Sequence, residues 1–253
     1  MTSTPATDLT RPTQRVQRVR HEIKRRDLQV VRVDAISPHF QRITFAGDAL
    51  ADFVSASFDD HVKVFLDTAV GIDPVRRDYT PRHFDTAACE LAIEFALHGD
   101  GPAANWAAQA TPGQTLSIGG PRGSLVIPTD FDWHLLVGDE TALPAIARRL
   151  EELPSTTRAI AVIHVADAAD QRPLPSAASV SVQWVAEAHA LVETVRALEL
   201  PSGEGYAWCA GEASVMAALR RVLVEEKGVD RHAVRAAAYW KRGAIAHHEN
   251  LDA

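Results

Sequence analysis

The sequence lacks the features of secreted, zinc-binding and membrane-spanning proteins. It has only two cysteines, Cys89 and Cys209, which are too few for a disulfide framework and lack the clustered spacing of a zinc site. No apolar run is long enough to cross a bilayer, and the N-terminus has no apolar signal-peptide region. We therefore expect a cytoplasmic protein without membrane insertion.

An excess of positive charge is also missing. The net charge is −7, so nucleic acid is not expected as a partner. Basic residues are nevertheless concentrated between positions 11 and 26. We interpret residues 1–26 as a flexible, mostly unstructured basic lead-in, and binding of an acidic partner is the alternative.

The first half of the chain is a series of short alternating apolar and polar runs separated by turns. We expect strands at 28–33, 42–45, 61–66, 90–97 and 114–118, with one short helix at 102–110. Short strands at this spacing, without long helices between them, predict an antiparallel β-barrel.

The second half alternates strands with helices. We expect strands at 135–137, 160–165, 180–185, 206–210 and 235–240, and helices at 143–153 and 189–198. A third helix is expected with its apolar stripe at 215–223, ended by Gly228. This alternation predicts an α/β domain with a mostly parallel sheet. The chain then divides into the lead-in, a barrel over 27–129 and an α/β domain with a C-terminal tail over 130–253, a layout analogous to ferredoxin-reductase-like flavoproteins.

The segment Arg77–Arg82 carries the strongest chemical signal. Read as one strand, it places Arg77, Tyr79 and Pro81 on one face, and Thr80 and Arg82 on the other. A flavin needs an aromatic plane beside its ring, hydroxyl or amide donors, and cations near its diphosphate. The segment supplies all of these types, although an edge strand with a solvated basic pair is the alternative.

This segment resembles the Arg-x-Tyr-Ser/Thr-x-Arg flavin motif of ferredoxin-reductase-like proteins. Its surroundings resemble the siderophore-interacting protein family in particular. The stretches that carry the resemblance follow one another in the family's order, from about residue 20 to the end: 58–63, 94–103, 120–124, 138–146, 210–212 and 238–243.

The resemblance implies that the barrel binds FAD. The side chains expected to hold it are Arg77, Tyr79, Thr80 and Arg82. The strand end Phe95, Ala96, Leu97 and His98 would present backbone groups to the flavin. The helix that opens at Gly101, Pro102, Ala103 and Ala104 would direct its free N–H groups at the diphosphate; a plain barrel cap is the alternative.

The turn 138–141 joins a strand to a helix at the usual dinucleotide position of an α/β domain. Asp139 and Thr141 are expected to contact the cofactor, with capping of the helix as the alternative. The nicotinamide side is expected at Gly138, Glu140, Ala210, Gly211 and Glu212. Two carboxylates beside a pyrophosphate are unfavourable, so NADH, NADPH and reduced ferredoxin all remain possible electron donors. Cys209, in an apolar strand, is expected to be buried and unreactive.

The end of the last strand is expected to complete the site. Ala238, Tyr239 and Trp240 would lie near the flavin or its adenine, with a core aromatic pair as the alternative. Lys63, Arg122, Lys241 and Arg242 would form a cationic pocket for ferric siderophores, although each alone could be a surface charge. His247 and His248 are interpreted as a solvated tail, and no protein-bound metal is expected.

The resemblance implies an FAD-dependent reductase that passes electrons from NAD(P)H or ferredoxin to ferric siderophore and releases Fe(II) in the cytoplasm. No side chain is expected to act as acid, base or nucleophile. Two alternatives remain open. One is a general NAD(P)H:flavin reductase or oxygenase partner, and the other is a carrier that binds ferric siderophores without reducing them.

Overall fold

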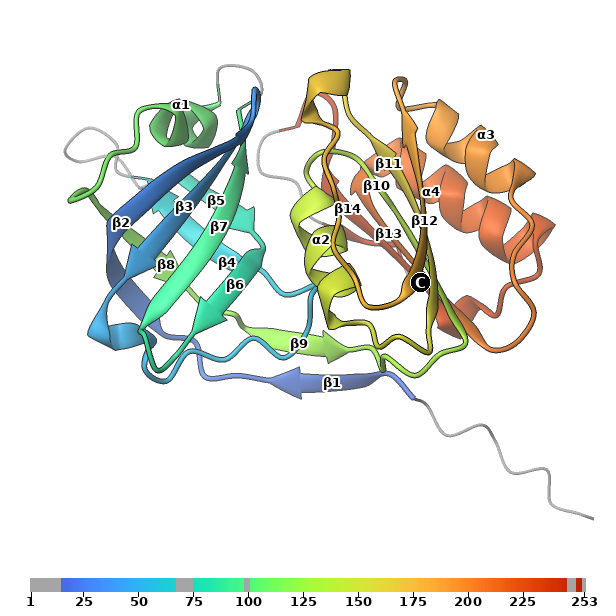
Figure 1. Ribbon diagram of the computed structural model, residues 1–253, viewed down its shortest axis with the longest axis horizontal. Helices are drawn as coiled ribbons and strands as arrows, with labels where there is room; N and C mark the ends of the chain where they lie inside the picture. Colours follow the sequence, from blue (N-terminus) through green and yellow to red (C-terminus); the bar gives the residue numbers. More distant parts are fainter. Residues whose placement is uncertain (1–14, 67–74, 98–100, 245–248, 252–253) are drawn as a thin grey trace, which may run out of the picture.

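Two β-sheets lie side by side in the protein (Figure 1). The structure is a computed structural model, and it describes residues 15–66, 75–97, 101–244 and 249–251. Within these residues, no helix combines the length and the apolar character needed to cross a membrane. They also contain no group of three or more side chains placed to hold a metal ion. His247 and His248 lie outside the described residues.

The first sheet is antiparallel throughout and strongly curled (Figure 1). Its strand order is β5-β4-β8-β2-β3-β7-β6. The strands are β2 (Arg25–Ser37), β3 (Phe40–Ala46), β4 (Val62–Leu66), β5 (Val75–Tyr79), β6 (Pro81–Asp85), β7 (Glu90–Ala96) and β8 (Thr115–Gly119). A short 3-10 helix covers Asp48–Leu50. The predicted antiparallel arrangement is confirmed.

Alternation along the strands places an apolar core inside this curl. Val62 and Val64 of β4 point inward, whereas Lys63 between them is exposed. Helix α1 (Pro102–Ala108) packs on the same core through Ala103 and Ala107. The period-two pattern is that of strands with one buried and one solvated face.

The second sheet is mixed, with the order β12-β11-β10-β13-β14-β15. Its strands are β10 (Trp133–Gly138), β11 (Arg158–His164), β12 (Ser179–Val185), β13 (Gly205–Glu212), β14 (Val234–Trp240) and β15 (Glu249–Asn250). Neighbours from β12 to β14 pair in parallel, and β15 pairs antiparallel with β14. The two-residue strand β15 was not expected, because it is too short to carry a sequence pattern.

Helices cover both faces of the second sheet (Figure 1). They are α2 (Leu143–Glu152) on one face and α3 (Ala190–Ala197) and α4 (Ala213–Arg221) on the other, with a π-helical turn at Val222–Glu226 and 3-10 turns at Ala168–Asp170 and Arg231–Ala233. Leu136 of β10 packs in the α2 cluster, and Leu135 and Val137 pack in the α3–α4 cluster. Every residue of β10 is buried because both faces are covered.

Helix α2 also joins the two sheets. Arg148 of α2 donates hydrogen bonds to the carbonyls of Ser55, at 3.0 Å, and Pro81, at 2.8 Å. Phe40 and Phe58 of the first half pack in the same apolar cluster as Leu136 and Ile146. The sheets therefore pack through a shared core, which fixes the walls of any pocket between them.

The expectation of an unstructured lead-in is wrong for its described part. Strand β1 (Gln17–Arg20) pairs antiparallel with β9 (Gly123–Val126), in a ribbon that runs beneath both sheets (Figure 1). The side chains of β1 are exposed, so its polar composition resembles that of a tail, whereas its backbone is paired. Arg15 places its guanidinium 4.2 Å from the ring centre of Phe131 and pairs with Glu204 and Asp130.

Candidate functional site

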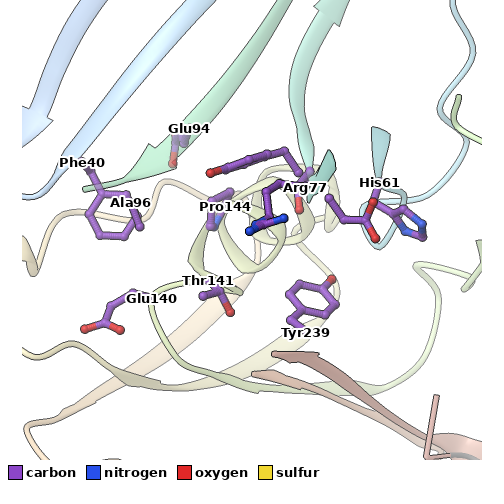
Figure 2. Close-up of a pocket in the computed structure, with 12 residues that line it drawn as sticks. Phe40, His61, Arg77, Glu94, Ala96, Glu140, Thr141, Pro144 and Tyr239 are labelled. Carbon is purple, nitrogen blue, oxygen red and sulfur yellow. The ribbon is translucent and has the colours of Figure 1, made fainter. Parts of the chain in front are cut away.

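A pocket of about 230 Å³ opens between the two sheets (Figure 2). The first half contributes the ends of β5 and β7, the start of β3 and the residue before β4. The second half contributes the turn before α2, the start of α2 and the end of β14. The lining residues are Phe40, His61, Arg77, Asp78, Tyr79, Thr80, Glu94, Ala96, Glu140, Thr141, Pro144 and Tyr239.

The Arg77–Arg82 segment forms one wall of the pocket, but it is not a single strand. Strand β5 ends at Tyr79 and β6 begins at Pro81, so Thr80 joins the two edge strands of the curled sheet. Pro81 has no N–H to continue a ladder, which accounts for the break. The predicted alternation of faces across the segment is therefore wrong, yet Arg77, Tyr79 and Thr80 all line the pocket.

Tyr79 presents a neutral aromatic ring to this pocket. Its ring centre lies 4.4 Å from that of Phe95, which is fully buried in the first core. Burial raises the pKa of the Tyr79 phenol well above its usual value, despite the opposing charge of Arg77. The phenol therefore stays protonated at neutral pH.

Arg82 is not among the residues that line the pocket. Its buried guanidinium forms two hydrogen bonds with Glu151 of α2, at 2.7 and 2.5 Å, and its Nε lies 3.3 Å from Glu94. Arg82 thus ties the first sheet to α2, and its predicted contact with FAD is not supported by its position.

The strand end and the short helix occupy the neighbouring surface. Ala96 lines the pocket, Leu97 donates its N–H to the carbonyl of His39 at 2.8 Å, and His98 lies outside the described residues. Gly101 is the N-cap of α1, and a Cβ built on it meets nothing within 4 Å. The backbone before Pro102 is therefore accessible, while Ala103 and Ala104 are buried.

Asp139 connects three strand ends of the second sheet. Its carboxylate accepts hydrogen bonds from the N–H of Thr141 at 3.0 Å, the N–H of Glu212 at 3.0 Å and the indole of Trp240 at 2.8 Å. Burial raises the pKa of Asp139, and these hydrogen bonds oppose that rise. The carboxylate fills the space where a Cβ on Gly211 would lie, 2.5 Å away, so this position requires glycine.

Of the other residues predicted for the nicotinamide side, Glu140 lines the pocket, and the rest have structural roles beside it. Glu140 lines the pocket and accepts a hydrogen bond from the N–H of Ala166 at 2.7 Å. Gly138 and Ala210 are buried, and a Cβ on Gly138 would collide with Ala142. Glu212 caps α4 by accepting from the N–H of Ser214 at 2.7 Å.

The end of β14 contributes one aromatic side chain to the pocket. Tyr239 lines it, and Figure 2 shows its ring across the cavity from Arg77. Trp240 instead extends toward Asp139 and remains partly exposed, whereas Ala238 is buried. Tyr239 also packs against the buried cluster that contains Trp208, whereas Trp240 does not, so the two rings do not form the core aromatic pair of the alternative.

The four predicted siderophore-binding cations lie outside the pocket lining. Lys63 is half-exposed and pairs with Asp78 at 2.7 Å, so it adjoins the cavity through a lining residue. Arg122, Lys241 and Arg242 are exposed, and the backbone N–H of Arg242 donates to Glu212 at 3.3 Å. Their collective role remains a prediction.

Sequence reasoning did not identify five lining residues: Phe40, His61, Asp78, Glu94 and Pro144. All except Phe40 belong to stretches that carried the family resemblance or the flavin motif, so a signal for them existed. Glu94 is the most constrained of these residues, with ion pairs to Arg42 at 2.6 Å and Arg172 at 2.5 Å. Phe40 reaches the pocket through the fold alone.

Comparison with protein families agrees with this architecture. Residues 29–71 and 69–125 match the siderophore-interacting FAD-binding domain, and residues 131–243 match the siderophore-interacting protein model. A solved ferredoxin-NADP+ reductase from Plasmodium falciparum aligns with a TM-score of 0.63, over 84% of this chain and 95% of that one. At 11% identity, this likeness shows the fold alone. The fold is therefore ferredoxin-reductase-like.

The alignments with relatives of similar length cover both sheets of this chain. The NADPH-dependent ferric-chelate reductase of Escherichia coli is 40% identical, with 88% of this chain and 96% of the relative aligned. The ferric vibriobactin reductase ViuB of Vibrio cholerae is 31% identical, with 88% and 92% aligned. A siderophore utilization protein from T. fusca superimposes with a TM-score of 0.86 at 33% identity, over 92% and 98% of the two chains. The chain belongs to the siderophore-interacting protein family.

Proposed function

We propose that this protein is an FAD-dependent reductase of ferric siderophores that takes its electrons from NADPH. The observation that carries the proposal is the pocket between the sheets, which is lined by Arg77, Tyr79 and Thr80 of the first half and by Thr141 and Tyr239 of the second. The E. coli relative, which is named an NADPH-dependent ferric-chelate reductase, aligns over almost its full length. A cytoplasmic location is part of the proposal, since the released iron is to be used inside the cell.

The side chains in the pocket fit a flavin. Tyr79 offers a neutral aromatic ring for a planar system, Thr80 offers a hydroxyl, and Arg77 offers a cation for a diphosphate. Thr141 donates its hydroxyl proton to Asp139, so it offers its oxygen as an acceptor. Phe40, Ala96 and Pro144 supply apolar surface that excludes water, as is usual for cofactor sites. We infer that Arg77, Tyr79 and Thr80 bind the cofactor directly.

FAD, when bound, accepts two electrons from a nicotinamide as a hydride and passes them on singly. The overall reaction is balanced when one NADPH reduces two ferric chelates, giving NADP+, two ferrous ions and one proton. The protein's own residues bind and orient the partners and exclude water. Ferric iron prefers hard oxygen ligands more strongly than ferrous iron does, so reduction weakens the chelate.

We infer a domain organisation that fits this reaction. Residues 27–129 would form the FAD-binding barrel, and residues 130–253 the nicotinamide-binding α/β domain with a mostly parallel sheet. The backbone at Phe95–His98 and the start of α1 at Gly101 would contact the ribityl and diphosphate groups. The Asp139 carboxylate is occupied by internal hydrogen bonds, which leaves Glu140 as the lining carboxylate on the donor side.

The substrate is proposed to dock at the mouth of the pocket. Lys63, Arg122, Lys241 and Arg242 would attract anionic ferric chelates and hold them near the flavin. The exposure of Arg122, Lys241 and Arg242 suits a docking role, whereas Lys63 would exchange its ion pair with Asp78 for the ligand.

An anaerobic assay tests the proposal. The purified protein, loaded with FAD, is mixed with NADPH and a panel of ferric siderophores, and ferrous iron is trapped with a coloured chelator. We expect two ferrous ions for each NADPH oxidised. Turnover of free flavin without ferric siderophore reduction would support a general flavin reductase instead. Tight binding of ferric siderophore without any ferrous signal, with NADPH, NADH or reduced ferredoxin, would support a carrier.

A further inference from the structure

The phenol of Tyr239 is bonded across the boundary between the two halves. Tyr239 belongs to β14 of the second sheet, and its ring lines the pocket opposite Arg77 (Figure 2). Its hydroxyl donates a hydrogen bond of 3.1 Å to Oδ1 of Asp59, which lies just before β4 of the first sheet. One pocket wall is thus attached to the half of the molecule that carries the opposite wall.

Asp59 is itself held in place by charge. Arg235, four residues before Tyr239 on β14, donates its Nε to Oδ2 of Asp59 at 3.1 Å. The side chains of Asp59 and Arg235 are 4% and 9% exposed, so the pair is shielded from solvent. Both donors from β14 therefore reach one carboxylate, Arg235 at Oδ2 and Tyr239 at Oδ1.

Aromatic packing orients the body of the Tyr239 ring. Its centre lies 6.3 Å from that of Trp208, edge to face, and Trp208 packs in the same manner against Phe58 at 5.3 Å. Phe58 directly precedes Asp59, so the hydroxyl reaches this loop directly and the ring is linked to it through Trp208. Burial, followed by the negative charge of Asp59, raises the pKa of Tyr239 well above its usual value and keeps the phenol a donor.

We propose that Asp59 is a positioning residue for the pocket: clamped by Arg235, it fixes the phenol of Tyr239 and so sets the ring of Tyr239 against the Arg77–Thr80 wall. The role of this wall in cofactor binding rests on the proposed function. The placement of the ring by Asp59 does not, because it follows from contacts within the chain. A fixed aromatic wall lowers the entropic cost of binding a planar ligand, because the ring does not have to be ordered when the ligand binds.

The placement is tested in the protein without cofactor. The chain has three tyrosines, so labelling with 3-fluorotyrosine gives a fluorine spectrum in which each can be assigned by its Tyr→Phe variant. We expect Asp59→Asn to shift the Tyr239 signal and to leave those of Tyr79 and Tyr206 in place. Asp52→Asn is the matched control, since it removes an exposed carboxylate paired with Lys24 and Arg26. An unmoved Tyr239 signal in folded Asp59→Asn overturns the proposal.

The consequence for the cofactor is tested by titration with FAD, monitored by visible absorption and circular dichroism. We expect Asp59→Asn and Tyr239→Phe each to raise the dissociation constant by about tenfold, the value of one hydrogen bond to a charged group. The double variant should bind no more weakly than Tyr239→Phe alone, because Tyr239→Phe already removes the bond that Asp59→Asn weakens.

The outcomes separate this proposal from the proposed function. Additive losses in the double variant, or an unchanged dissociation constant in Tyr239→Phe, overturn the positioning role. Tyr239→Phe removes a single oxygen, so it carries the test if Asp59→Asn does not fold. Wild-type protein that binds no FAD would contradict the proposed function, while the fluorine measurement would still decide the placement of Tyr239.

Discussion

His134 is a neutral histidine in the buried strand β10, with 1% of its surface exposed. Burial, aided by the nearby charge of Arg149, lowers its pKa to about 3. Below pH 6.5 the unfolded chain binds a proton at this site that the folded protein does not, so stability falls as pH falls. Between pH 7 and pH 5 the loss from this group is about 2 kcal/mol.

The prediction is checked by urea unfolding of the wild type and His134→Gln at both pH values. We expect the free energy of unfolding of the variant to fall by about 2 kcal/mol less than that of the wild type between pH 7 and pH 5. Other titrating groups contribute equally to both proteins and cancel in the comparison. Identical pH dependence in the two proteins would show that His134 does not titrate on unfolding.

The two cysteines differ in their expected reactivity. Cys209 is fully buried in β13, and burial raises its pKa to about 12, which confirms the expectation of a buried thiol. Cys89 is partly exposed. Because the thiolate is the reactive form, a thiol reagent at pH 8 should modify one cysteine in the folded protein and the second only after denaturation. Rapid modification of both in the native protein would be inconsistent with a closed second sheet.

At the scale of elements, the ion pair between Arg82 of β6 and Glu151 of α2 is expected to stabilise the fold rather than to bind the cofactor. Arg82→Gln removes both bonds to Glu151 and leaves the buried carboxylate of Glu94 with less compensation. We expect a loss of about 3 kcal/mol in the free energy of unfolding. Arg32→Gln, which breaks an exposed pair with Asp34, should cost less than about 1 kcal/mol.

The same variants decide the role that the motif assigned to Arg82. FAD affinity should change less than twofold in folded Arg82→Gln, whereas Arg77→Gln should weaken it by about tenfold or more. Equal losses of affinity in the two variants would restore the original prediction that Arg82 contacts the cofactor.

Strand β1 provides a second element-scale prediction. Deletion of residues 1–20 removes the partner of β9 and the contacts of Arg15, whereas deletion of residues 1–14 leaves both. We expect the longer deletion to lower the melting temperature by about 5 °C, the equivalent of roughly 2 kcal/mol in a chain of this size. Comparison with the shorter deletion isolates the contribution of residues 15–20. Equal melting temperatures would mean that β1 does not contribute to the fold.

Sequence patterns predicted the strands and helices in which the buried side chains recur at the period of the element itself. Strand β4, with alternating Val62 and Val64, and helix α2, with Leu143, Ile146 and Leu150, lie where their patterns place them. Strand β1 could not be predicted, because its pairing uses backbone groups and its side chains are all exposed. The break at Thr80 had a local signal in Pro81, but the placement of the two resulting strands at opposite edges of the curled sheet is a tertiary property.

The candidate site shows the same division. Chemistry identified Arg77, Tyr79 and Thr80, because a flavin motif is a local sequence feature. The positions of Arg82, Asp139 and Trp240 are set by hydrogen-bond partners far along the chain, such as Glu151 and Glu212. The spacing of residues in the sequence does not reveal these partners. Asp59 was part of a stretch that suggested the family, but only the fold brings it to Tyr239.

At the scale of the whole molecule, the pocket exists because two sheets are held in a fixed arrangement. Arg82–Glu151, Glu94–Arg172 and Asp59–Arg235 each join a residue of the first half to one of the second. At least one side chain of each pair is buried, and we infer that the pairs contribute to the geometry of the pocket more than to stability. The resulting cavity brings the flavin motif of one sheet to the strand ends of the other, where dinucleotides bind in open α/β sheets.

The central claim is that this cavity holds FAD, and the flavin content of the protein tests it most directly. Protein purified without added cofactor, and again after incubation with FAD and removal of the excess, is heat-denatured, and the released flavin is identified and quantified. The account predicts a yellow protein that releases one FAD per chain. A colourless protein that releases no flavin, and takes up none on incubation, would contradict it.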